Sequence, residues 1–192
     1  MSVRVAKPEE RERVFSLECL AFAKDPIMRW MLPDPAQYLE LFPKMCAPFA
    51  GQAFELGTAY VDEEFRGACM WFPEGVHSDM EAMAGVMAGA LEPAFLEAAA
   101  PFFEQMDEHH PKTPHWYLPM IGVDPARQGE GVGSSLLAKA LERVDAEGLP
   151  AYLESSNPAN IPLYRRHGFE VVAEIQAADS PVMYPMSRPA RG

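Results

Sequence analysis

Apolar and polar positions follow two different periods along this chain, and each change of period marks an expected element. Residues 2–6 alternate between polar and apolar side chains, as a short strand does, whereas residues 7–25 carry apolar side chains at helical spacing after Pro8. The first half predicts a strand at 2–6, helices at 7–25 and 35–51, the second interrupted by prolines, and a hairpin at 57–72 around Asp62, Glu63 and Glu64.

A helix-rich segment follows, and the pattern then becomes more regular. Ser78 and Asp79 are both N-cap candidates for a helix that reaches about residue 91, and residues 93–110 continue as helix. The remaining expected elements are strands at 115–123 and 151–155, helices at 131–147 and 157–168, ended by Gly148 and Gly168, and antiparallel strands at 169–175 and 182–188. The pattern indicates one mixed α/β domain over 1–192 with a helical insertion at about 76–112.

Length and composition are those of an ordinary globular domain. The 192 residues are 48% hydrophobic and 23% charged, and the longest apolar stretch is broken by two glutamates and a proline. The first residues, MSVRVAKPEERERV, lack the apolar segment of a signal peptide, and Cys19, Cys46 and Cys69 are too scattered for a disulfide framework. We therefore expect a soluble, cytoplasmic protein with reduced thiols.

The formal net charge of −12 argues against nucleic acid and against an anionic membrane as partners, and it favours a cationic small molecule. The exposed final strand at 182–188 could pair with a second copy in a homodimer, although Pro185 interrupts continuous backbone pairing.

The stretch DPARQGEGVGSSLL, residues 124–137, places Gly129, Gly131 and Gly133 between a predicted strand and a predicted helix. A P-loop would need Gly-Lys-Ser/Thr, and a dinucleotide fingerprint would need its third glycine at Ser134, so neither fits. The remaining pattern, Q/R-x-x-G-x-G/A, begins at Gln128, and bare N–H groups at such a helix start can hold a phosphate. A turn that only allows close packing is the alternative.

Two motifs in the second half resemble the GNAT superfamily of acyl-CoA-dependent N-acyltransferases. MIGVDPARQGEGVGSSLLAKAL (120–141) is similar to its acyl-CoA strand and pyrophosphate loop, and YLESSNPANIPLYRRHGFEVV (152–172) to the following strand, asparagine turn and tyrosine-bearing helix. HHPK, WYLPMIGVDP, LESS and NPANIPLYRRHGF look most like the puromycin N-acetyltransferase subgroup. The resemblance implies a splayed, mostly antiparallel central sheet flanked by helices, with an acyl-CoA-binding core at about 115–175.

The resemblance also implies acetyl-CoA as acyl donor and a set of backbone contacts to it. Main-chain groups of Ile121, Gly122 and Val123 would pair with the pantetheine arm and hold the acetyl carbonyl. Asn157 or Asn160 would bond a pantetheine amide, with a helix N-cap as the alternative role of Asn157. The pyrophosphate would be held by the loop residues Gln128, Gly129, Glu130, Gly131, Val132, Gly133 and Ser134.

The same resemblance assigns the chemistry to a tyrosine. Tyr164 matches the family residue whose hydroxyl reaches the thioester sulfur, where it can protonate the departing thiolate. Glu154, directly or through water, is the first candidate for the base that deprotonates an ammonium acceptor, and His115 is the second. His109 and His110 have no third ligand at suitable spacing, so no metal site is expected.

Trp30, Trp71 and Phe72 are candidates for the wall of an acceptor pocket for a bulky amine, with core packing as the alternative. The predicted function is acetyl transfer from acetyl-CoA to a primary amine of a small molecule. A non-catalytic acyl-CoA-binding module and a protein or peptide N-acetyltransferase are the alternatives.

Overall fold

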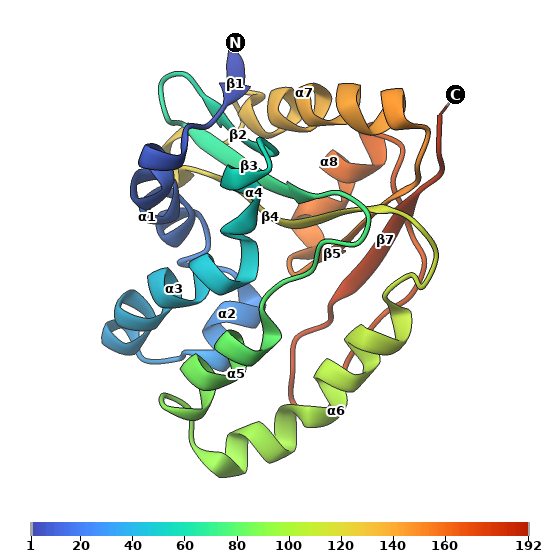
Figure 1. Ribbon diagram of the computed structural model, residues 1–192. Helices are drawn as coiled ribbons and strands as arrows, with labels where there is room; N and C mark the ends of the chain where they lie inside the picture. The colour runs from blue at the N-terminus through green and yellow to red at the C-terminus, as the bar shows by residue number, and fades with distance from the viewer. Residues whose placement is uncertain (1, 192) are drawn as a thin grey trace.

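The computed structural model describes residues 2–191, and a seven-stranded sheet runs through its centre (Figure 1). The strand order is β1-β2-β3-β4-β5-β7-β6, and every neighbouring pair is antiparallel except β4 and β5. The strands are β1 (Val3–Val5), β2 (Ala59–Asp62), β3 (Gly67–Phe72), β4 (Trp116–Val123), β5 (Ala151–Ser155), β6 (Glu170–Val171) and β7 (Tyr184–Arg188).

Helices cover both faces of this sheet. The α-helices are α1 (Arg11–Ala21), α2 (Pro26–Met31), α3 (Pro35–Ala50), α4 (Gln52–Glu55), α5 (Met80–Ala88), α6 (Pro93–His109), α7 (Val132–Glu147) and α8 (Ile161–Arg166). Three short 3-10 helices, η1 (Pro8–Glu10), η2 (Pro125–Arg127) and η3 (Pro158–Asn160), stand before α1, α7 and α8. Figure 1 shows α7 along the top of the view, and α5 and α6 at the opposite end.

Alternation along the strands divides the core into two clusters. In β3, Ala68, Met70 and Phe72 belong to the cluster that contains α1 and α3, while Cys69 and Trp71 belong to the cluster that contains α7. Successive strand side chains point to opposite faces of a sheet, so a strand covered by helices on both sides is apolar at every position. This explains why β3 is buried along its whole length.

The two parallel strands separate soon after they begin. Trp116 pairs with Ala151 and Tyr117 with Tyr152, but β4 continues to Val123 without further pairing to β5. Pro119 lacks an N–H group to donate at the point of divergence. The predicted splayed, mostly antiparallel sheet flanked by helices is therefore confirmed.

Several element boundaries differ from the sequence predictions. The helix expected from residue 7 is divided into η1 and α1, and α3 runs unbroken through Pro43 and Pro48. The strand expected at 169–175 is reduced to β6 and one isolated bridge between Ile175 and Met183. Asp79, whose carboxylate accepts from the N–H of Ala82, is the N-cap of α5.

We had predicted that the final strand is exposed, and this prediction was wrong. β7 lies between β5 and β6, and Pro185 stands opposite Glu154 within a continuous register. A dimer formed by pairing along β7 would need an edge that the chain already occupies. Within residues 2–191, no helix is both long enough and apolar enough to cross a membrane.

Candidate active site

The glycine loop between β4 and α7 has the backbone conformation of an anion cradle. Gly129 and Gly131 have φ angles of 82° and 84°, in the left-handed region that favours glycine, and Gly131 is the N-cap of α7. No side chain caps this helix, so its first N–H groups remain available to a ligand. Glycine at position 133 serves close packing instead. A Cβ there would lie 3.2 Å from Leu163 Cδ2, so glycine lets α7 approach α8.

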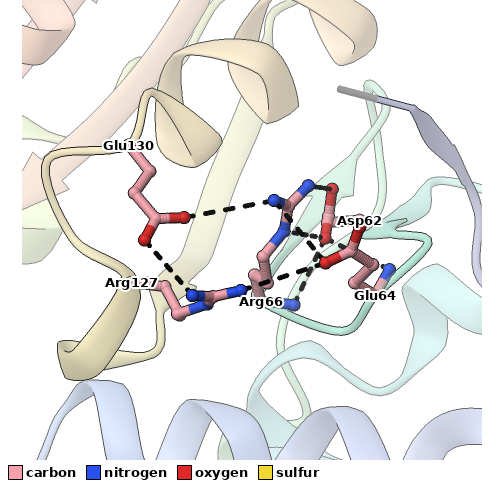
Figure 2. A network of polar contacts seen from close by, with 5 residues as sticks. All are labelled: Asp62, Glu64, Arg66, Arg127 and Glu130. Carbon is pink, nitrogen blue, oxygen red and sulfur yellow. Dashed lines mark hydrogen bonds and ion pairs between the residues drawn. The ribbon is translucent and has the colours of Figure 1, made fainter.

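Charged side chains tie this loop to the β2–β3 hairpin (Figure 2). The Arg66 guanidinium donates to both carboxylate oxygens of Asp62, at 2.7 and 2.9 Å, and lies 4.0 Å from Glu130. Arg127 lies 3.4 Å from Glu130 and 4.0 Å from Glu64. The charges of Arg127 and Glu130 are therefore engaged with one another and with the hairpin, which fixes the loop from its outer side.

The other predicted loop residues lie in the same turn. Val132 is buried, and its side chain packs where a Cβ on Gly67 would stand. Ser134 Oγ lies 2.8 Å from His167 Nε2, and the Gln128 side-chain amide donates to the carbonyl of Val123 at 3.4 Å. These contacts leave the main-chain N–H groups at the start of α7 as the part of the loop that can hold a phosphate.

Gly122, in the diverging half of β4, lies directly beneath α1. A Cβ at Gly122 would stand 2.2 Å from Glu18 Oε2 and 2.7 Å from the Ala21 side chain, so only glycine fits. The Glu18 carboxyl is completely buried, and neither oxygen has a hydrogen-bond partner among the described residues. Burial raises its pKa well above the usual range, and the Gly122 N–H acts in the opposite direction.

A cavity of about 520 Å³ brings the predicted chemistry together. Tyr164 from α8, Glu154 from β5, and Ile121 from β4 all line it, as does Asn160 from η3. Nine of the twelve methionines of the chain lie in its wall, together with phenylalanines from α3 and α6. The surface of this cavity is thus mostly apolar, with a few polar groups in addition to Tyr164 and Glu154. Such a surface is typical of a small-molecule site.

Tyr164 is 5% exposed and its ring meets the edge of Phe169. Burial is the largest cause that raises the pKa of its hydroxyl, and the negative charges of Asp25 and Glu18 act in the same direction. The hydroxyl therefore keeps its proton at neutral pH and can donate it to an atom in the cavity.

Glu154 has a side chain that is 5% exposed, and it lies beside three aromatic rings. Its Oε1 is 3.4 Å from His110 Nδ1, while the rings of Tyr117 and Tyr152 lie 4.9 and 5.0 Å from that imidazole. Burial and the Glu154 charge raise the pKa of both tyrosines. Glu154 therefore places a carboxyl group in the cavity beside His110, Tyr117 and Tyr152.

The two asparagines have separate positions. The Asn157 side chain accepts from the N–H of Ala159 at 3.0 Å and caps η3, which is the alternative role considered for it. Asn160 follows three residues later and lines the cavity. Of the two, Asn160 has its side chain in a position to meet a ligand.

The aromatic residues expected around the acceptor lie elsewhere. Trp71 and Phe72 are completely buried on opposite faces of the sheet, and neither lines the cavity, because β3 is covered by helices on both sides. Trp30 packs behind the wall against Phe95 and Phe102, and its indole N–H donates to Asp179 at 3.1 Å. None of these three aromatic residues lines the cavity, whose wall is formed mainly by methionines and by the phenylalanines of α3 and α6.

Asp25 is a cavity residue that the sequence patterns did not single out. Its carboxylate caps α2 by accepting from the N–H groups of Ile27 and Met28 at 3.0 Å, and the Ser156 hydroxyl donates to it. Burial raises its pKa. The sequence signal is the Asp-Pro pair before α2, which predicts an N-cap but does not reveal the cavity.

Within residues 2–191, no cluster of three or more histidine, cysteine, aspartate or glutamate side chains could hold a metal ion. The remaining features are a glycine cradle at a helix start, parallel strands that diverge beside it, and a tyrosine-bearing helix over the opening. Together they define the architecture of the acyl-CoA-dependent N-acyltransferases.

The chain belongs to the Acetyltransferase (GNAT) family, whose model matches residues 56–169, more than half of its length. An uncharacterized N-acetyltransferase of Schizosaccharomyces pombe is 36% identical over 77 residues, which are 40% of this chain and 29% of that protein. A mycothiol acetyltransferase of Mycobacterium sp. (strain JLS) is 30% identical over 131 residues, 64% of this chain and 39% of the relative. The chain thus matches less than two fifths of the length of these curated relatives.

The same family appears among solved structures. The crystal structure of histone acetyltransferase HPA2 and related acetyltransferase from Corynebacterium glutamicum is similar with a TM-score of 0.68. The sequence identity is 26%, and the match covers 100% of this chain and 97% of that one.

Proposed function

We propose that this protein transfers the acetyl group of acetyl-CoA to the primary amine of a small molecule with a large apolar body. The observation that carries the proposal is the 520 Å³ cavity, in which Tyr164, Glu154 and the diverging strand β4 meet an apolar wall. Membership in the acetyltransferase family supports the reaction, and the character of the wall supports the acceptor.

The acceptor follows from the shape and chemistry of this wall. Methionine side chains are flexible and polarizable, so they pack against apolar groups of many shapes. Asp25, Asp107 and Glu154 supply carboxylates in the same cavity, and the net charge of −12 adds a field that attracts cations. An ammonium at the end of an alkyl or aryl body fits this combination better than a polyamine, which would place further charges against methionines.

The residues divide the reaction between them. Glu154 takes the proton that the ammonium must lose before its nitrogen can attack, and backbone N–H groups of residues 121–123 hold the carbonyl oxygen on which charge develops. As the new C–N bond forms and the C–S bond breaks, Tyr164 donates its hydroxyl proton to the sulfur. The nitrogen, which still carries one hydrogen too many for an amide, loses that proton through water to the Tyr164 oxygen, and this restores the phenol. Acetyl-CoA supplies the activated acyl group.

The start of α7 is the part of the chain that fits the cofactor's pyrophosphate. Its uncapped N–H groups and the helix dipole favour a negative charge, and each charge-assisted bond contributes about 1.5–3 kcal/mol. The open space around Gly129, where nothing lies within 4 Å of an added Cβ, leaves room for a ligand to approach the backbone.

Calorimetric titration with acetyl-CoA tests the cradle. Gly131→Asp places a carboxylate at the N-cap, and we expect binding to weaken by about 10- to 100-fold, equivalent to losing one or two charge-assisted bonds. Gly131→Asn is the matched control, because asparagine has the same shape and tolerates the same backbone conformation without the charge. Saturable binding of acetyl-CoA to the wild type, retained in Gly131→Asn and lost in Gly131→Asp, supports the proposal. Absence of binding to the wild type contradicts it.

Release of CoA thiol with a panel of amines tests the acceptor. We expect phenylethylamine and hexylamine to be acetylated with higher kcat/KM than putrescine, agmatine or a peptide N-terminus. Faster turnover of the peptide would indicate a protein acetyltransferase, the activity named for the structure from Corynebacterium glutamicum. Tight acetyl-CoA binding without thiol release from any amine would indicate a binding module.

A further inference from the structure

Two cavities meet at His110, which stands directly after α6. The large cavity contains Glu154, and a second one of about 410 Å³ contains His115 and the surface residues Lys112 and Thr113. Glu154 lines only the first and His115 only the second, whereas His110 lines both. The His110 imidazole is therefore part of the wall between the catalytic cavity and the surface.

A continuous line of polar atoms passes through this wall. Glu154 Oε1 lies 3.4 Å from His110 Nδ1, and His110 Nε2 lies 3.1 Å from His115 Nε2. His115 Nδ1 lies 2.7 Å from the carbonyl oxygen of Thr113. Three ionisable side chains thus lie in a row, and the row ends at a backbone carbonyl.

The last contact fixes the hydrogens of the whole row. A carbonyl can only accept, so His115 Nδ1 must carry a hydrogen, and the Nε2 of a neutral His115 is then an acceptor. A neutral His110 donates to it from Nε2, which leaves His110 Nδ1 without a hydrogen and facing the Glu154 carboxyl group. A proton that arrives on Glu154 therefore meets a free acceptor.

We propose that His110 and His115 relay to the surface the proton that Glu154 takes from the amine. This inference rests on the proposed function, in which Glu154 is the base. It assigns a role in proton transfer to two histidines that no ligand needs to touch, and it connects the helical insertion with the chemistry.

The relay moves one proton for each acetyl group transferred. An N–H bond of the ammonium breaks as an O–H bond forms on Glu154, and this O–H bond then breaks as an N–H bond forms at His110 Nδ1. In the same step the Nε2–H bond of His110 breaks and one forms at Nε2 of His115, whose Nδ1–H bond then breaks to release the proton to water. Both histidines then regain their first tautomers by exchange with water, since the His110 side chain is 23% exposed and His115 is only partly buried.

The groups around the row are compatible with this path. Burial lowers the pKa of His115, so its imidazole is neutral near pH 7 and can accept. Tyr117 of β4 and Tyr152 of β5 face His110, but their raised pKa values keep them protonated, so neither competes for the proton. The charged and titratable groups beside the second cavity are Glu74, His77, Asp107 and Lys112.

Kinetics of His110→Phe and His115→Phe test the relay, because phenylalanine keeps a ring against the tyrosines and removes the nitrogens. We expect kcat to fall at least about tenfold, within the range of general acid–base effects, with KM for acetyl-CoA unchanged. Added imidazole should restore kcat, and the pH at which kcat is half-maximal should shift. His109→Phe is the matched control: His109 is the exposed neighbour of His110 and should leave all parameters unchanged.

Unchanged kcat in both variants would overturn the relay, as would a loss that imidazole does not restore and that accompanies a raised KM for the amine. Nitrogen-15 NMR of the imidazoles gives a test that does not need an active acceptor. We expect the Nδ1–H tautomer at His115, and changes at both histidines in Glu154→Gln. Titration of His110 and His115 independently of Glu154 would overturn the inference while leaving the acetyltransferase proposal standing.

Discussion

Tyr164 carries a hydroxyl at the wall of the cavity, and its replacement by phenylalanine removes that group alone. Because the raised pKa keeps the hydroxyl protonated, we expect it to act as donor to the sulfur and not as base. Tyr164→Phe should lower kcat by about 100-fold, the lower end of general acid effects, with the dissociation constant of acetyl-CoA unchanged.

Steady-state kinetics of Tyr164→Phe measures kcat, and calorimetry measures the dissociation constant of acetyl-CoA. Tyr184→Phe is the control, since Tyr184 lies on β7 and does not line the cavity. Wild-type turnover in Tyr164→Phe would remove the hydroxyl from the mechanism.

Glu18 is a second residue whose side chain has a measurable effect, because its buried carboxyl makes the stability of the fold depend on pH. Its pKa is raised by burial above the ordinary value of 4.5, so the folded protein retains a proton that the unfolded chain loses. Stability contributed at this position is therefore present below pH 4.5 and is lost as the pH rises toward the folded-state pKa. Glutamine has the same shape and no such loss.

We expect Glu18→Gln to raise the Tm at pH 8 by about 2–4 °C, roughly 1 kcal/mol for a chain of this size, and to raise it less at pH 4.5. Thermal unfolding followed by circular dichroism at both pH values checks this. Glu12→Gln, on the exposed side of the same helix, is the control. A lower Tm of Glu18→Gln at pH 8 would mean that the carboxylate stabilises the fold.

At the scale of elements, the β2–β3 hairpin and the glycine loop are held together by one arginine. Arg66 is the charged partner of Asp62, whose side chain is fully buried, and its hydrogen bonds lower the pKa of that carboxyl (Figure 2). Removal of the Arg66 side chain leaves the Asp62 carboxylate only the longer contacts from the N–H groups of Glu64 and Arg66, at 3.2 and 3.4 Å, so it destabilises the fold more than loss of an exposed ion pair does. Arg127, at 44% exposed, belongs to the same network but should contribute about 0.5 kcal/mol.

We therefore expect Arg66→Met to lower the urea midpoint at pH 7 by several times as much as Arg127→Met does, because only Arg66 pairs with a carboxylate that water does not reach. The lowered pKa means that this stabilisation is present above pH 3.8 and disappears as the pH falls through the folded-state value. The difference between wild type and Arg66→Met should accordingly shrink on acidification. Equal losses of stability in Arg66→Met and Arg127→Met would contradict our inference that the pair of Arg66 with Asp62 provides most of the stabilisation in this network.

At the scale of the whole molecule, the sheet brings distant segments to one cavity. Asp25 precedes α2, Tyr117 and Ile121 stand on β4, and Glu154 and Tyr164 follow much later in the chain. The divergence of β4 from β5 opens the space into which these side chains project. Side chains of α5 and α6, which lie at the opposite end of the molecule from α7 (Figure 1), complete the wall of this cavity.

Local chemistry made much of this arrangement predictable. Gly131 and Gly148 bound α7 because both take the left-handed conformation that glycine adopts without strain. Alternation identified the β2–β3 hairpin, and the expected strand and glycine loop are β4 and the turn after it. The prediction of a continuous strand over 169–175 was wrong. Only two of these residues pair with β7 as a strand, and one more forms an isolated bridge.

The sequence by itself determined most of the elements and the glycine turn before α7, because each depends on neighbours within a few residues. The candidate tyrosine came from the resemblance of its motif to the acyltransferase family. Only the tertiary structure decided which side chains line the cavity: Trp71 and Phe72 are aromatic in sequence but buried by helices on both faces of β3. It likewise decided that Glu154 meets His110, 44 positions away, and that β7 is an inner strand. Such contacts depend on strand order and on the packing of helices over the sheet, which no local pattern encodes.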